Sequence, residues 1–168
     1  MALLSEVELR VLEKKFSSGI PSAELVRAFS SRGERFSEAT LRKYVQLGLL
    51  PRSQRIGTQG RHRGSSGLYP AETVRLVNAI KKSLENGATL GEIRLGPVGV
   101  EGDLVAIQQS CNAFIGRVRE VVEHEKDRQR RAALRRERDR IEKVVSKNIA
   151  AIEKFAERLV RSEKRARG

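Results

Sequence analysis

Residues 37–51 read SEATLRKYVQLGLLP, and this stretch predicts more about the fold than any other part of the chain. Ser37 is a typical helix N-cap, because its hydroxyl can accept a hydrogen bond from a free amide of the first turn. Gly48 suits the left-handed position just after a helix, and Pro51 prevents a restart. Between them, apolar residues at helical spacing predict one buried face: Leu41, Tyr44, Val45 and Leu47.

Another short helix is predicted directly before this one. Ser22 is its expected N-cap, its apolar side holds Leu25, Val26 and Phe29, and it ends near Gly33. Two short helices joined by a few residues make a helix-turn-helix candidate. Residues 1–20 mix apolar positions with charges, and they predict an N-terminal helical extension.

Residues 51–70 have a different composition. They contain several arginines, no acidic residue and regularly placed glycines. Such a stretch is either a β-ribbon with a mobile tip, which would form a small β wing, or a flexible linker. A longer helix over residues 71–86 is then predicted, with Gly87 at its end, and a short helix around Leu90 and Ile93 closes the domain.

The run GPVGVEG at residues 96–102 is predicted to be a linker and the main domain boundary. Residues 103–168 are predicted to form a separate helical tail, in which apolar residues follow two heptad patterns separated by a charged stretch. This tail is either one long helix with a phase shift or a helical hairpin. Its heptad positions are the predicted dimerisation residues: Leu104, Ile107, Cys111, Phe114, Val118, Ile141, Val145, Ile152, Phe155 and Leu159.

Composition narrows the class of partner. The formal net charge is +13, which favours a polyanion such as nucleic acid. A single cysteine, Cys111, excludes an intramolecular disulfide and a multi-cysteine metal site within one chain. No segment is apolar enough for a signal peptide or membrane insertion, so a cytoplasmic, nucleoid-associated protein is expected.

The segment 21–95 resembles the DNA-binding domain of the MerR family, a winged helix-turn-helix. The likeness rests on five pieces in the family's order, which are SEATLRKY at 37–44, GLLP at 48–51, the basic segment, GLY at 67–69 and LGEIR at 90–94. The fold expected for the whole chain is therefore mainly α, a winged helix-turn-helix head with a small β wing, followed by the heptad-patterned tail. The chain departs from the family in its N-terminal extension, its longer wing and its lack of a visible sensor.

Candidate DNA contacts follow from the predicted recognition helix and wing. Arg42 can bind a guanine edge or a phosphate, and Ser37 lies where backbone amides attract phosphate. The resemblance implies that Arg42 and Tyr44 touch the DNA backbone and that wing arginines reach the adjacent groove. For Tyr44, packing in the core with the hydroxyl at the edge is favoured over a DNA contact. Lys43 replaces the family's usual second aromatic. The full predicted set is Ser37, Thr40, Arg42, Lys43, Tyr44, Arg52, Arg55, Arg61, His62 and Arg63.

The sequence shows no arrangement of nucleophile, base or paired carboxylates that would support catalysis, so we expect a protein that is not an enzyme and needs no cofactor or metal. The leading hypothesis is a homodimeric, sequence-specific regulator of transcription that binds double-stranded DNA. The alternative is a nucleoid-organising or segregation protein whose coiled-coil tail binds a protein partner. A third hypothesis is a coiled-coil adaptor whose basic head binds RNA or an acidic protein.

Overall fold

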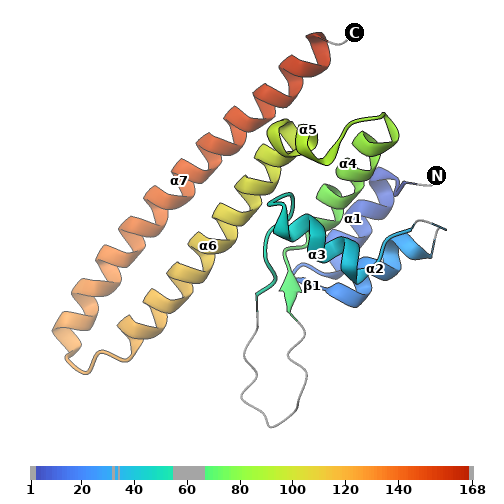
Figure 1. Cartoon of the computed structure of the whole chain (residues 1–168). Coiled ribbons are helices and arrows are strands. Elements are labelled where there is room, and N and C mark those ends of the chain that lie inside the picture. The colour runs from blue at the N-terminus through green and yellow to red at the C-terminus, as the bar shows by residue number, and fades with distance from the viewer. Residues whose placement is uncertain (1–2, 32, 34, 55–66, 167–168) are drawn as a thin grey trace. The chain divides into compact units, whose positions relative to one another are not determined.

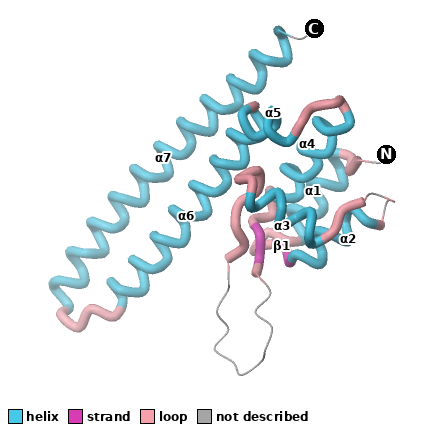
Figure 2. Tube along the Cα trace, in the orientation of Figure 1, coloured by secondary structure: helices cyan, strands magenta, loops and turns pink. Residues whose placement is uncertain are grey.

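A computed structural model of the chain describes residues 3–31, 33, 35–54 and 67–166, leaving out the side chains of 157 and 159–166. This part of the chain is mainly helical and contains one two-stranded sheet (Figures 1 and 2). The chain divides into two compact units, Met1–Ala106 and Ile107–Gly168, and each is described by itself.

The first unit consists of short helices around one hydrophobic core. Its elements in chain order are α1 (Glu6–Lys15), β1 (Ile20–Pro21), α2 (Ser22–Ser30), α3 (Glu38–Gln46), β2 (Leu68–Tyr69), α4 (Thr73–Glu85), α5 (Leu90–Leu95) and the beginning of α6 (Pro97–Glu123). The helices predicted from the sequence over residues 22–33, 37–47, 71–86 and 90–93 are thus present, with ends that differ by a few residues.

The ends of α3 are built as the sequence predicts. The Ser37 hydroxyl accepts a hydrogen bond from the Thr40 amide at 3.3 Å. At the other end Gly48 has a φ of +69°, and the amides of Gly48 and Leu49 donate to the carbonyls of Val45 and Tyr44 at 3.1 and 2.9 Å. This pair of bonds is a Schellman motif, which fixes where the helix stops and where the chain turns.

The beginning of α2 differs from the prediction in one residue. The N-cap is Pro21, with an extended backbone, and Ser22 is the first helical residue and makes no capping bond. Pro21 is held in that extended conformation by pairing with Leu68 in the sheet. A strand contact from a distant segment therefore moved the cap by one position.

The core of this unit lies under α2, α3 and α4. Leu25 and Phe29 of α2 are fully buried, and Leu41 of α3 and Val77 of α4 lie beside them in the same cluster. Phe36, in the turn between α2 and α3, meets the Phe29 ring edge-on at a centroid distance of 5.4 Å. Burying each such side chain contributes about 1.5–3 kcal/mol, so this cluster fixes α3 on its support.

A small sheet closes one side of the unit. Ile20 pairs with Tyr69 and Pro21 with Leu68, antiparallel, and Leu68 also exchanges two 2.8 Å backbone hydrogen bonds with Gln54. The two ends of the 51–70 segment are therefore paired with each other, as a β-ribbon requires. Residues 55–66, between them, lie outside the described part.

The N-terminal helix is part of this unit rather than an appendage. Arg75 of α4 donates to Glu13 of α1 at 2.9 and 3.0 Å and to Glu6 at 2.7 Å. Asn78 forms two hydrogen bonds with the backbone of Leu4, at 2.9 and 3.1 Å. Within the predicted extension at residues 1–20, Glu6–Lys15 form a helix, and its contacts with α4 join this helix to the core.

The predicted linker at 96–102 is wrong. Gly96 is the C-cap of α5, Pro97 begins α6, and α6 continues without a break to Glu123. A Cβ at Gly102 would lie 2.7 Å from the backbone oxygen of Leu49, and one at Gly99 would overlap the backbone of Arg94. The glycines in this run allow close packing, and the boundary between the units falls later, after Ala106.

The second unit is a helical hairpin, one of the two alternatives that the sequence left open. The later part of α6 runs antiparallel to α7 (Arg128–Ala166), as Figure 1 shows. Arg119 pairs with Glu142 at 2.7 Å, and Glu123 pairs with Arg135. The Asp127 carboxylate accepts hydrogen bonds from the amides of Arg130 and Gln129 at 3.0 and 2.7 Å, which cap α7 and lower the pKa of Asp127.

The predicted dimerisation residues have two different environments. Cys111, Val118 and Val145 of the hairpin are half-buried, as is Leu104, which belongs to the first unit. The remaining described members keep much of their surface exposed: Ile107, Phe114, Ile141, Ile152 and Phe155. The side chain of Leu159 lies outside the described residues. Folding back therefore satisfies only part of the heptad pattern.

Candidate nucleic-acid interface

The exposed side of α3 is the candidate interface. Arg42 and Lys43 project to solvent in its second turn, and neither forms an ion pair with any residue that the structure describes. Thr40 is half-buried beside Ser37, with 3.2 Å between the two hydroxyl oxygens. Guanidinium, ammonium and hydroxyl groups are the donors that proteins use to bind phosphate and base edges.

The opposite side of α3 explains why these groups face outward. Leu41 and Tyr44 are buried in the cluster that also contains Phe29 of α2. Because residues three and four apart share a helix face, seating these two turns the side chains of 42 and 43 away from the core. The helix is thus fixed in rotation as well as in position.

Tyr44 belongs to the core and not to the exposed surface. Its side chain is 5% exposed, its ring lies 6.1 Å from that of Phe36, and burial raises the pKa of its hydroxyl. Of the two roles that the sequence suggested, packing is the one observed. The contact with the DNA backbone that the resemblance implies for Tyr44 stays a prediction.

Only the two ends of the basic segment after α3, residues 51–54 and 67–70, are described. Arg52 is exposed, two residues before the Gln54 pairing with Leu68. Arg55, Arg61, His62 and Arg63, the other predicted wing contacts, lie outside the described residues. Gln54 and Leu68, which flank residues 55–66, are paired through their backbones. The segment that holds these predicted contacts therefore leaves and rejoins the described structure at one place, shortly after α3 in the sequence.

Gln46 is a candidate that the sequence reasoning missed. It lies four residues after Arg42 and three after Lys43, at the end of α3, and is exposed on the same side. Glutamine can form paired hydrogen bonds with an adenine edge, so it adds base-reading chemistry to a row of cations. The helical spacing from Arg42 was a signal that could have identified it.

Two other kinds of feature are not found among the described residues. There, no group of three or more histidine, cysteine, aspartate or glutamate side chains is placed to hold a metal ion. Among the described helices, none combines the length and apolar character needed to cross a bilayer. Comparisons with protein-family models, curated proteins and solved structures found no match to this chain.

Proposed function

We propose that this protein binds double-stranded DNA through α3, as a homodimeric, MerR-like regulator of transcription. The observation that carries the proposal is the exposed group of Arg42, Lys43 and Gln46 on a helix whose other side is buried in the core. A recognition helix needs this combination of a rigid seat and a polar outer side. The turn after α2 and the paired base of the basic segment fit a winged helix-turn-helix.

Charge supports a duplex as the ligand. The chain carries a net charge of +13, and Arg42 and Lys43 of α3 form no ion pair with any described acidic residue. The aromatic rings near α3, Phe36 and Tyr44, are buried, which leaves no stacking platform on the described part of this surface. Single-stranded nucleic acid is usually bound by such platforms, so a duplex fits better.

The apolar face of the hairpin supports pairing of two copies. Phe114, Phe155 and Val121 are 54%, 59% and 72% exposed, and they belong to a larger set of exposed apolar side chains completed by Ile107, Ile141, Val144 and Ile152. Side chains such as Val122 of α6 and Ile149 of α7 lie between the two helices. The exposed apolar side chains of each helix lie about 90° around its axis from that inner side, so the exposed apolar row of α6 and that of α7 form one face of the hairpin. Covering that face in a second copy would contribute on the order of 1 kcal/mol per side chain.

The DNA proposal is tested by binding assays on the full-length protein. A site is first selected from random duplexes, and affinity is then measured by fluorescence anisotropy. Arg42→Ala should weaken binding to the selected site by about 1–3 kcal/mol if Arg42 reads a base. Lys43→Ala should lower the slope of log affinity against log salt by about 0.9 per bound protomer if it contacts one phosphate.

The matched control is Lys82→Ala, which removes one exposed lysine from α4 instead. Equal effects of Lys43→Ala and Lys82→Ala would show that net charge, and not α3, governs binding. A wild-type protein that binds no duplex in a salt-sensitive way would refute the proposal altogether. Genome-wide occupancy then separates a regulator, with promoter-centred sites, from the organiser alternative, with dispersed sites.

Pairing is tested by sedimentation velocity. The double variant Phe114→Ser/Phe155→Ser should shift the protein toward the monomer, because both side chains lie on the apolar face. The control Val7→Ser/Val11→Ser removes two exposed apolar side chains from α1 and should leave the wild-type state unchanged. A wild-type protein that is monomeric at high concentration would rule out the homodimer.

A further inference from the structure

The outer side of α7 carries a row of basic residues that the function proposed for α3 does not use. In steps of three and four residues, positions 136, 140, 143, 147, 150, 154 and 158 read Arg, Arg, Lys, Lys, Ala, Lys, Arg. We call Arg136, Arg140, Lys143, Lys147, Lys154 and Arg158 the α7 basic row. All six are exposed, and they extend over about 33 Å of helix at 1.5 Å per residue.

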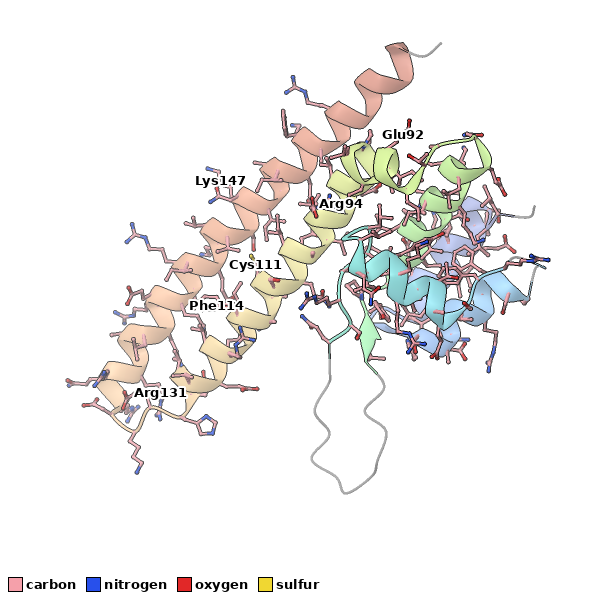
Figure 3. The ribbon with its side chains drawn as sticks, viewed as in Figure 1. Glu92, Arg94, Cys111, Phe114, Arg131 and Lys147 are labelled. Carbon is pink, nitrogen blue, oxygen red and sulfur yellow. The ribbon has the colours of Figure 1, made fainter. Side chains whose placement is uncertain are left out.

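The row faces away from α6. Figure 3 shows Lys147 on the side of α7 remote from the other helix of the hairpin. On the side toward α6, Glu142 pairs with Arg119 and Glu153 accepts from Gln108. Glu142 and Glu153 therefore face α6, whereas the α7 basic row lies on the opposite side of α7.

The α7 basic row forms no ion pair within the described part of the chain. Asp139, which lies three residues after Arg136 and four before Lys143, pairs with Arg138 at 2.7 Å instead. Like charges at i,i+3 and i,i+4 repel one another, and neighbouring members of the row stand at these spacings, so binding of an anion would relieve that repulsion.

We propose that the α7 basic row binds the phosphate backbone of duplex DNA without reading its sequence. This inference rests on the proposed function of α3, and it adds a second DNA-binding surface in the other unit of the chain. The length of the row, about 33 Å, is close to one turn of B-DNA at about 34–36 Å, so it can reach phosphates along one turn.

Two other polyanionic partners fit the row less well. A helix that lies on a membrane surface needs large apolar side chains beside its cations, but the gap in the row is filled by Ala150 and Ala151. The large apolar side chains of α7, such as Phe155, lie on the face assigned to pairing. Single-stranded nucleic acid would need aromatic rings within the row, and the row contains none.

The test compares two triple variants of the full-length protein with equal loss of charge. The row variant is Arg140→Gln/Lys143→Gln/Lys147→Gln. The control variant is Lys14→Gln/Lys82→Gln/Arg117→Gln, which removes one arginine and two lysines, all exposed, from other helices. Glutamine keeps a helix propensity close to that of lysine and arginine, and removing repulsion should leave α7 at least as helical by circular dichroism.

Binding to the selected duplex and to a random duplex of about 30 base pairs is measured across a salt series. The row variant should lower the salt slope for both duplexes by about 2–3 per bound protomer, because each phosphate that the protein no longer neutralises reduces the slope by about 0.9. The ratio of selected to random affinity should stay unchanged. The control variant should lower the slope by less than about 1 per bound protomer. Equal slopes for the two triple variants would overturn the inference.

Binding to vesicles containing 30% phosphatidylserine tests the membrane alternative. If the row variant loses vesicle binding and keeps wild-type DNA binding, the row is a membrane surface and the inference is wrong. Failure of this inference is distinct from failure of the α3 proposal. The first leaves Arg42→Ala defective on the selected site, whereas the second removes salt-sensitive duplex binding from the wild-type protein.

Discussion

Replacing Gly102 by alanine tests whether the glycine-rich run at 96–102 packs closely or is a linker. In α6, a Cβ at this position would lie 2.7 Å from the backbone oxygen of Leu49. Ordinary carbon–oxygen contacts are about 3.3–3.6 Å, so either α6 or the turn at 48–49 must move by more than half an ångström. The position of a Cβ is fixed by its own backbone and the Leu49 oxygen is a backbone atom, so no side-chain rotation can relieve the overlap.

The magnitude follows from two opposing effects. Alanine in place of glycine favours a helix by up to about 1 kcal/mol. Overpacking of this kind costs about 1–3 kcal/mol, so Gly102→Ala should lower the free energy of unfolding by about 1–2 kcal/mol. Gly91→Ala in α5 is the matched control. Its new Cβ would meet the Thr89 hydroxyl oxygen at 3.9 Å, an ordinary contact, and it should be neutral or stabilising.

Tyrosine fluorescence during urea denaturation at 25 °C is the assay. The chain has no tryptophan, and both of its tyrosines, Tyr44 and Tyr69, are buried in the first unit. Their emission therefore reports on this unit, whatever happens in the hairpin. If Gly102→Ala unfolds at the same urea concentration as Gly91→Ala, α6 does not pass close to Leu49 and the run is the linker that the sequence predicted.

Two further predictions concern local caps and ion pairs. Ser37→Ala removes the hydroxyl that accepts from the Thr40 amide and should destabilise the first unit by about 1 kcal/mol, measured by the same tyrosine signal, whereas Ser146→Ala in the middle of α7 should have no such effect. Hydrogen bonds from Arg135 and Arg119 are the main cause of the lowered pKa values of Glu123 and Glu142, respectively. The contribution of these two carboxylates to hairpin stability is therefore fully present above the ordinary carboxyl pKa, and it is lost as the pH falls through their lowered pKa values. Far-UV circular dichroism should show hairpin stability falling below about pH 4 at low salt, and Glu123→Gln should reduce that fall; a pH dependence unchanged by the substitution would exclude the ion pair as its cause.

The sequence alone determined the short helices of the first unit, because their signals act within a few residues. A Ser37 hydroxyl reaches its own first turn, and a glycine at 48 permits the left-handed turn that ends α3. The apolar spacing of Leu41 and Tyr44 likewise identified the buried side of α3, and with it the exposed side of Arg42 and Lys43. Gln46 shares that spacing and could have been included.

Tertiary structure decided those features that depend on distant segments. The glycines at 99 and 102 have the composition of a linker, but whether glycine provides freedom or close approach depends on the backbone that lies against it, here at Arg94 and Leu49. The heptads of the tail specify that a partner helix is needed without saying which one. In the structure the partner helix comes from the same chain, since α6 and α7 are joined by ion pairs. Each helix can cover only one side of the other, so one apolar face and the α7 basic row stay exposed.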